Sequence, residues 1–159
     1  MCLLDEQDDF WQADNGRSHL TASCWILSPS LDAILLLHHR KLNRWLQPGG
    51  HIEAHDNSWL EAALREACEE TGIENFQQLV PGIFDFDIHT IPARGSVPEH
   101  QHYDARFLLQ AEKSEIHFSD ESNDLQWFSP DKAASLIGGD PVMDRMLEKT
   151  RLLMESKRR

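Results

Sequence analysis

The sequence predicts an α/β fold with a mixed β-sheet, on three observations. Segments rich in β-branched and aromatic residues recur between turn residues along the chain, which is typical of short strands. Residues 58–71 carry apolar residues with the i, i+3, i+4, i+7 spacing of a helix that buries one side. A second helical pattern ends the chain. Strands mixed with helices in this way indicate the α/β class.

The first part of the chain is expected to form a helix and then a pair of strands. Residues 5–14 predict a short acidic helix. The expected strands are residues 20–27 and 33–38, followed by a short extended piece over residues 44–47. Ser28-Pro29-Ser30 breaks the apolar run between the two strands. The paired glycines of Pro48-Gly49-Gly50 then allow a tight turn and a close approach to a ligand.

The central helix is expected over residues 58–71, because both of its ends carry stop signals. Ser58 is a suitable N-cap, with Glu61 at the capping-box spacing, and Gly72 is a natural C-terminal stop. The apolar stripe consists of Leu60, Ala63, Leu64 and Ala67. This stripe predicts which side of the helix packs on the sheet.

The second half of the chain predicts further strands and two helices. The expected strands are residues 78–87, 103–111, 115–118 and 125–128, with a loop marked by Pro92, Gly95 and Pro98. Ser129-Pro130 has the order of a cap followed by proline in the first helical turn. The last helix is expected after Asp140-Pro141, to about Glu155.

Length and charge restrict the classes of partner. A chain of 159 residues is long enough for one domain with its own core. The net charge of −12 argues against binding to duplex nucleic acid or to an anionic membrane. The same acidity would repel a phosphate substrate, so a local basic patch is expected, and residues 38–41 with Arg44 could supply it. The other interpretation of these residues is a solvated hairpin.

Cysteine usage and the apolar runs indicate a cytoplasmic protein. Cys2, Cys24 and Cys68 are odd in number and show no Cys-x-x-Cys pair, which suggests neither a disulfide framework nor a structural zinc site. The chain opens with acidic residues where a signal peptide would be basic, and its longest apolar run, residues 33–37, is too short to span a bilayer. Whether the chain forms a homodimer is left open by the sequence.

The central helix also carries the strongest chemical signal. Glu66, Glu69 and Glu70 project within roughly one 100° arc, with Arg65 beside them, on the side opposite the apolar stripe. Three carboxylates on one face repel one another unless a hard divalent cation such as Mg²⁺ lies among them. The alternative for the glutamates alone is a solvated acidic face.

The segment from Gly50 to Ile73 as a whole resembles the Nudix box. The positions that match are Pro48, Gly49, Gly50, Glu53, Arg65, Glu66, Ala67, Glu69, Glu70, Gly72 and Ile73. The departure is Asp56, which is separated from Gly50 by five residues and stands in place of the usual Glu, with eight residues rather than seven before Arg65. We treat Asp56 as a shortened stand-in whose own part is open.

The resemblance implies a fold, a reaction and a set of site residues. It implies an α-β-α sandwich around a mixed sheet over residues 18–155, with residues 1–17 as an N-terminal extension. It also implies Mg²⁺-dependent attack of water on the diphosphate of a nucleoside diphosphate linked to another moiety, such as a nucleotide sugar, a dinucleotide or a (d)NTP, with Mn²⁺ as a possible substitute. The implied metal ligands are Glu66, Glu69, Glu70 and the Gly50 carbonyl. Arg65 would hold a box glutamate by a fork-shaped ion pair, and Glu121, from the loop before a late strand, is the candidate for a further acid or base.

Two other functions and one other site stay open. A non-catalytic ligand sensor on a Nudix fold usually loses box glutamates, and an isopentenyl-diphosphate isomerase needs a cysteine in a local motif that is absent here. His100, His102 and Asp104 alternate on one expected strand face, so they could converge on a ligand or metal. The alternative is a hydrogen-bonded strand face.

Overall fold

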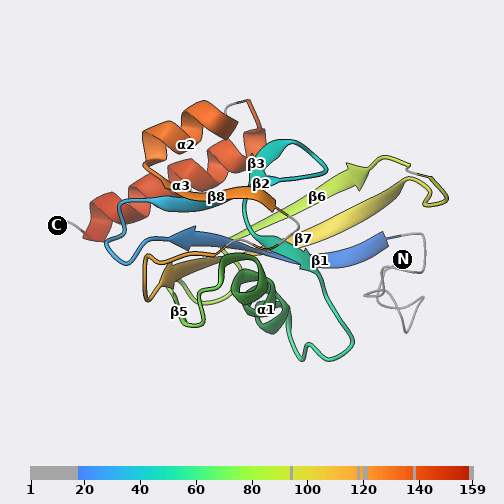
Figure 1. Cartoon of the computed structure of the whole chain (residues 1–159), viewed down its shortest axis with the longest axis horizontal. Coiled ribbons are helices and arrows are strands. Elements are labelled where there is room, and N and C mark those ends of the chain that lie inside the picture. The colour runs from blue at the N-terminus through green and yellow to red at the C-terminus, as the bar shows by residue number, and fades with distance from the viewer. Residues whose placement is uncertain (1–17, 94, 118, 120–121, 138, 158–159) are drawn as a thin grey trace.

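Helices cover both faces of a mixed β-sheet. The computed structural model describes residues 18–93, 95–117, 119, 122–137 and 139–157. Helix α1 (Trp59–Thr71) lies on one face of the sheet, and α2 (Pro130–Ile137) and α3 (Pro141–Lys157) lie on the other (Figure 1). This arrangement confirms the expected α-β-α sandwich. The helix expected over residues 5–14 lies outside the described residues.

Two long parallel strands form the centre of the sheet. The strands are β1 (Ser18–Leu27), β2 (Ile34–His39), β3 (Arg44–Leu46), β4 (Gly49–His51), β5 (Phe76–Gln78), β6 (Asp85–Ile91), β7 (His100–Ala111) and β8 (Ser122–Phe128). β1 and β7 run parallel and pair along the whole of β1. The other pairs, β1 with β2 and β4, β2 with β3 and β8, and β7 with β5 and β6, are antiparallel, so the sheet is mixed as predicted.

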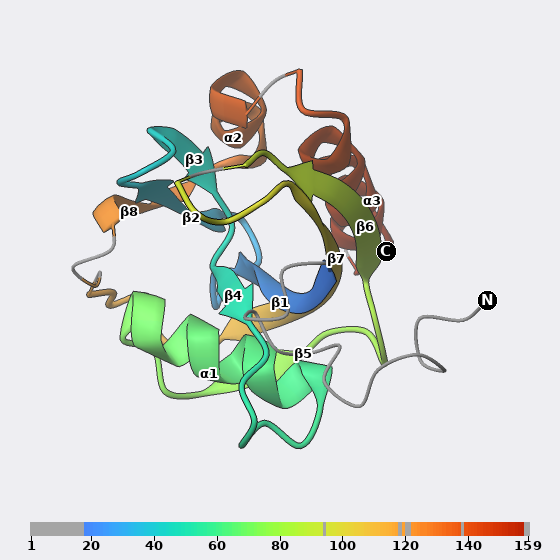
Figure 2. The same ribbon diagram turned by 90° about the vertical axis from the view of Figure 1, so that its right-hand side faces the viewer.

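Both central strands change neighbour along their length. The middle of β1, residues 21–23, pairs with β4, and its last two residues pair with β2. The first half of β7 likewise pairs with β6, and its end pairs with β5. The sheet is therefore divided and strongly curved, with β6 and β7 on one side and β2, β3 and β8 on the other (Figure 2). The short strand β4 lies at this division.

Alternation along β1 separates two cores. Cys24 and Ile26 point to the core beneath α1, whereas Trp25 and Leu27 point to the core beneath α2 and α3. Successive side chains of a strand point to opposite faces, so residues 19, 21 and 23 share the face of Trp25. These three residues are His19, Thr21 and Ser23, and all are buried. One sheet face is therefore apolar under the two C-terminal helices and polar at its other end.

The ends of α1 agree with the prediction. The Ser58 hydroxyl accepts a hydrogen bond from the Glu61 amide at 3.1 Å, and Gly72 adopts a left-handed φ of 68° while its amide donates to the Cys68 carbonyl. Ala63 and Ala67 are fully buried, as the apolar stripe requires. The helix therefore presents its acidic side away from the sheet core.

Two predicted strands were wrong, and one was missed. The strand expected over residues 78–87 is two strands, because a turn containing Gly82, with φ of 74°, separates β5 from β6. Residues 115–117 of the expected strand 115–118 are not a strand. The His117 amide instead donates to the Thr71 carbonyl at 2.8 Å, so this segment closes the end of α1. β4 was not expected, since two of its three residues are glycines.

The hairpin between β6 and β7 is longer than the sequence suggested. β6 reaches Ile91 and β7 begins at His100, so the connection shrinks to residues 92–99. His89 pairs with His102 across this hairpin, and Ile91 pairs with His100.

Among the described residues, no helix is long and apolar enough to cross a membrane.

The packing of α3 on the sheet predicts the cost of removing one buried hydroxyl. The Trp25 Nε1–H donates to Thr150 Oγ1 at 2.9 Å, this hydroxyl donates to the Met146 carbonyl at 2.7 Å, and Trp25 and Thr150 are fully buried. Thr150→Val keeps the shape of the side chain but leaves the Trp25 N–H without an acceptor, so we expect the free energy of unfolding to fall by about 1–3 kcal/mol. Urea denaturation measures this change. Leu152→Ala, at a position on the same helix that is 59% exposed, is the control, and equal stability of the two variants would contradict the assignment.

Candidate active site

The two glycines of β4 bring its backbone against the acidic side of α1. The Gly49 amide donates to Glu70 Oε2 at 2.8 Å. A Cβ on Gly50 would lie 2.5 Å from Glu66 Oε1, and a Cβ on Gly49 would lie 2.5 Å from the Ser23 hydroxyl oxygen. A Cβ on Gly49 would also lie 2.6 Å from the Ser23 Cα, so it would push β4 away from β1, whereas a Cβ on Gly50 would displace the Glu66 carboxylate. Glycine is therefore required at position 49 for close approach, and at position 50 it leaves room for Glu66.

Arg65 connects the helix to the loop that follows β4. Its Nε and Nη2 donate to the two carboxylate oxygens of Asp56 at 3.1 and 2.9 Å, and Nη2 also donates to the His51 carbonyl at 3.0 Å. Nη1 donates to Glu66 Oε1 at 2.9 Å and to Glu69 Oε2 at 3.4 Å. The Arg65 and Asp56 side chains are only 15% and 1% exposed, so this ion pair is shielded from solvent.

The partner of the Arg65 fork differs from the expectation. Arg65 donates two hydrogen bonds to Asp56, from Nε and Nη2, whereas Glu66 accepts one, from Nη1. The Arg65 hydrogen bond lowers the pKa of Asp56, although burial opposes the shift. Asp56 is shorter than glutamate, and it reaches the guanidinium from the loop while its Oδ2 also accepts from the Glu53 amide at 2.8 Å. Asp56 therefore positions Arg65, which in turn positions Glu66.

The three predicted glutamates line one pocket but do not meet at a point. Glu66, Glu69 and Glu70 line a pocket of about 600 Å³ together with Gly50 and Lys41. Burial raises the pKa of Glu66, against the effect of Arg65. Glu66 and Glu69 accept from Arg65, whereas Glu70 is held by the β4 amide. Mutual repulsion of carboxylates favours this separation.

The donors around this pocket fit a hard divalent cation. Carboxylates of Glu66, Glu69 and Glu70 are the oxygen ligands that Mg²⁺ and Mn²⁺ prefer, and the absent Cβ of Gly50 leaves the β4 backbone directly beside the Glu66 carboxylate. A backbone carbonyl oxygen is a further ligand of the same type. The arrangement is therefore suited to a cation held between the α1 carboxylates and β4.

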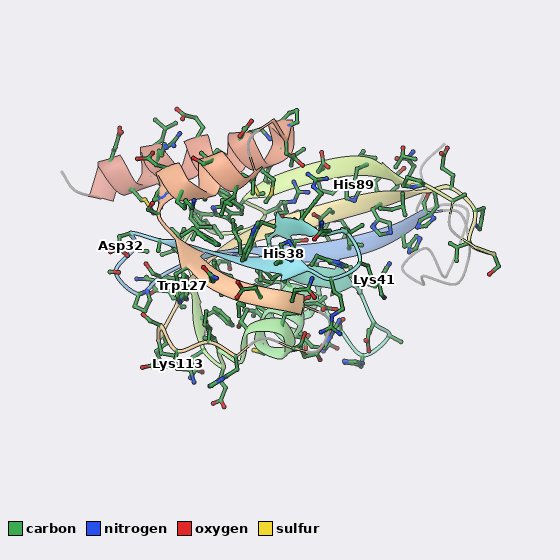
Figure 3. The ribbon with its side chains drawn as sticks, turned by 45° about the horizontal axis from the view of Figure 1, so that its top comes forward. Asp32, His38, Lys41, His89, Lys113 and Trp127 are labelled. Carbon is green, nitrogen blue, oxygen red and sulfur yellow. The ribbon has the colours of Figure 1, made fainter. Side chains whose placement is uncertain are left out.

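The predicted basic patch divides between two places. Lys41 lines the pocket of the glutamates, at the β2–β3 hairpin (Figure 3). Arg44 pairs with Asp140 at 3.0 Å, and Arg40 donates to Asn123 Oδ1 and to the Ser122 carbonyl, both at 3.3 Å. Only part of the patch thus faces the carboxylates, because most of its cations are used to tie the hairpin to neighbouring segments.

A second pocket of about 480 Å³ adjoins the first. It lies on the polar end of the sheet face shared with α2 and α3, and both pockets are lined by Gly49, Gly50 and Glu70. The buried Arg106 lines it, and among the described atoms Arg106 Nη1 has no hydrogen-bond partner. Arg106 Nε donates to Asp104 Oδ2 at 2.7 Å. A buried cation with one free donor at a pocket wall is suited to receive an anionic group.

The expected set of His100, His102 and Asp104 is only partly assembled. His100 Nε2 lies 3.3 Å from His102 Nε2. Asp104 instead accepts from the hydroxyls of Thr21 and Ser23, at 3.1 and 2.8 Å. The carboxylate is thereby engaged in a buried hydrogen-bond network and does not join the histidines.

Two further histidines lie against this pair. The His19 ring stacks on His51 and His100, with ring centres 5.0 and 4.3 Å apart, and meets His102 edge-on at 4.7 Å. Burial, with the neighbouring imidazoles, lowers the pKa of His19 to about 4 and that of His102 to about 3. These rings are therefore neutral at physiological pH.

Sequence reasoning missed the residues that only the sheet register brings to the site. His19, His51 and Arg106 were not selected, and the available signal was the i, i+2 spacing of polar residues on otherwise apolar strands. The predicted Glu121 lies outside the described residues.

The two cysteines among the described residues, Cys24 and Cys68, give no support for nucleophilic or isomerase chemistry. Cys24 is buried and its thiol donates to the Ala63 carbonyl at 3.0 Å. Burial raises the pKa of both Cys24 and Cys68. A thiolate, the reactive form, is therefore disfavoured at both positions.

Known proteins resemble the chain over most of its length. A sequence model of the NUDIX domain matches residues 17–150. The chain is 32% identical over 108 residues to a probable DHNTP pyrophosphohydrolase of Lactococcus lactis subsp. cremoris, a match that covers 67% of the chain and 62% of that protein. It is 29% identical over 126 residues to the asymmetrical bis(5'-nucleosyl)-tetraphosphatase of Rattus norvegicus, covering 76% of the chain and 78% of the relative.

A solved structure agrees with this match. A hydrolase of the NUDIX family from Clostridium perfringens has a TM-score of 0.66 and 26% identity, over 85% of this chain and 97% of that one. The same segment that carries the glycine strand, the Arg65 fork and the three glutamates lies within the matched region. The chain is therefore a member of the Nudix hydrolase family.

Proposed function

We propose that this protein hydrolyses the pyrophosphate bond of a nucleoside diphosphate linked to another moiety, with Mg²⁺ as the cation and Mn²⁺ as a substitute. The observation that carries the proposal is the pocket in which Glu66, Glu69 and Glu70 face the double glycine of β4. The names of the relatives, a DHNTP pyrophosphohydrolase and a bis(5'-nucleosyl)-tetraphosphatase, support a phosphoric anhydride as the bond that is cleaved.

The residues of the chain supply distinct parts of this chemistry. A bound Mg²⁺ neutralises phosphate charge and lowers the pKa of a coordinated water. Glu66, Glu69, Glu70 and the Gly50 carbonyl would hold the cation. Arg65 fixes the Glu66 carboxylate at 2.9 Å, and Asp56 fixes Arg65. The role of Glu121 as a further acid or base stays a prediction.

The two adjoining pockets support a division of the substrate. The phosphates would lie at the shared wall formed by Gly50 and Glu70, where a bound cation would offset the local negative charge of the glutamates. The rest of the substrate enters the pocket of about 480 Å³, in which the free Nη1 of Arg106 faces an anionic or carbonyl oxygen. We expect nucleotide sugars, dinucleotides and (d)NTPs to differ in how they fill this second pocket.

Removing a metal-binding charge should abolish turnover while the fold is kept. Glu69→Gln and Glu70→Gln each remove one anionic ligand, so we expect kcat to fall by at least about a hundredfold. The measurement is Mg²⁺-dependent release of phosphate or nucleotide from a panel of nucleotide and nucleotide-sugar pyrophosphates. Glu74→Gln, an exposed position just beyond α1, is the matched control and should retain full activity. Unchanged turnover in both site variants would refute the proposal.

The fork geometry of Arg65 should matter as well as its charge. Arg65→Lys keeps the charge but cannot contact both Asp56 oxygens, Glu66 and the His51 carbonyl at once. We expect kcat, or the Mg²⁺ affinity, to fall about ten- to a hundredfold. Arg151→Lys, in an exposed ion pair with Asp131, is the control for the same substitution. A Mg²⁺ titration of turnover that is identical for the two variants would contradict this role.

A further inference from the structure

Three strands bring three imidazoles together at the polar end of the sheet. His19 is on β1, His51 on β4 and His102 on β7, and their ligand nitrogens all lie within 4.8 Å of one another. His19 and His102 are direct partners in the parallel pair, and His51 lies opposite Thr21, two residues along β1. β1 and β7 begin at the end of the sheet where β6 ends (Figure 1). His89, labelled in Figure 3, belongs to β6. The register of the sheet therefore builds the group.

The ring nitrogens of His19 are buried without a hydrogen-bond partner among the described atoms. The residue is only 4% exposed. Buried polar atoms are nearly always satisfied, because desolvation without a new contact is unfavourable. The His19 ring is held in place by stacking on His51 and His100. A metal ion within the histidine group would give one of these two nitrogens a partner.

The surroundings favour a metal over an anion or a proton. Close packing of the rings and burial of His19 disfavour protonation of these imidazoles, and neutral rings carry no charge that would hold an anion. The buried carboxylate of Asp104, on the same strand as His102, is used by Thr21, Ser23 and Arg106. Neutral imidazole is a preferred ligand of Zn²⁺ and related transition metals, whereas Mg²⁺ prefers oxygen. The group therefore differs in chemistry from the glutamate site.

We propose that His19, His51 and His102 bind a divalent transition metal ion of the Zn²⁺ type. Zn–N distances of about 2.0–2.1 Å in a tetrahedral site require nitrogens about 3.3 Å apart, so the rings close by at most about 1.5 Å on binding. His100 supports the site: its Nδ1 lies 2.8 Å from the Pro98 carbonyl and its Nε2 lies 3.3 Å from His102 Nε2. Such outer contacts commonly orient a ligating histidine.

The site adjoins both pockets and leaves a coordination position open. His102 lines the pocket of about 480 Å³, and His51 lines the pocket of the glutamates. Three protein ligands leave the fourth position of a tetrahedral ion for water or for a substrate group. The ion also ties β1, β4 and β7 together, so it stabilises the division of the sheet where β4 meets α1. This inference does not depend on the proposed hydrolase activity.

Metal titration tests the proposal directly. The full chain is stripped with EDTA and then titrated with Zn²⁺ by calorimetry and with Co²⁺ by visible absorption, in excess Mg²⁺ so that oxygen-ligand sites are filled. We expect about one Zn²⁺ per chain, visible bands of tetrahedral Co²⁺ and a rise in melting temperature with Zn²⁺. His51→Gln, at an exposed position, and His19→Asn should each weaken binding at least about tenfold.

Two controls separate this site from other metal binding. His38→Gln removes a histidine of β2 outside the group and should bind Zn²⁺ as the unmodified chain does. Glu70→Gln should lose turnover but keep Zn²⁺ affinity, because Glu70 lies outside the histidine group. Circular dichroism melts identify any variant that fails to fold. If His19→Asn does not fold, the Zn²⁺ affinity of His51→Gln alone tests the proposal. Zn²⁺ binding that is absent from the unmodified chain, unchanged in His51→Gln, or lost equally in Glu70→Gln overturns the proposal.

Discussion

The close contact between β4 and the acidic side of α1 is the constraint on which the candidate site depends. It exists because Gly49 and Gly50 carry no Cβ: at both positions a side chain would collide with atoms 2.5 Å away. The contact lets a backbone amide hold Glu70 and places the β4 backbone beside Glu66. Oxygen donors from a strand and a helix can therefore face one cation.

Electrostatics then decide how the carboxylates are arranged. The chain has a net charge of −12, and Arg65 is the cation that neutralises the face of α1. The Arg65 side chain is nearly buried, and its charge is balanced there by Asp56, which accepts hydrogen bonds from Nε and Nη2 on the side away from the glutamates. The inserted residue of the box and the shorter aspartate are compatible with this contact, since the loop supplies the reach that the side chain lacks.

The division of the sheet explains why polar and apolar regions share one face. Beyond Ser23, residues of β1 on this face are covered by α2 and α3, and they are apolar. Before it, β1 exchanges β2 for β4, the helices no longer cover the face, and Thr21, Ser23 and Asp104 form a buried network. The second pocket and the histidine group both lie in this polar region. The second pocket, which would select the substrate, and the proposed metal site of the histidines therefore both depend on the exchange of β2 for β4 as the neighbour of β1.

The sequence by itself determined the local features of this protein. The apolar stripe, the Ser58 cap and the Gly72 stop lie within a few residues of one another, so they predicted α1 closely. The motif that runs from Pro48 to Ile73 predicted the Nudix family, which the match to the NUDIX domain confirms. β5 and β6 were merged because a short turn between apolar residues hardly interrupts the pattern, and β4 was missed because glycines carry no strand signal.

Only the tertiary structure decided which distant residues meet. The partner of the Arg65 fork depends on where a loop places Asp56, and the grouping of His19, His51 and His102 depends on the register of three strands that are far apart in the chain. A shift of register by one residue would send each histidine to the other face. The spacing of residues along a chain contains no such register, because pairing between strands is set by the packing of the whole sheet.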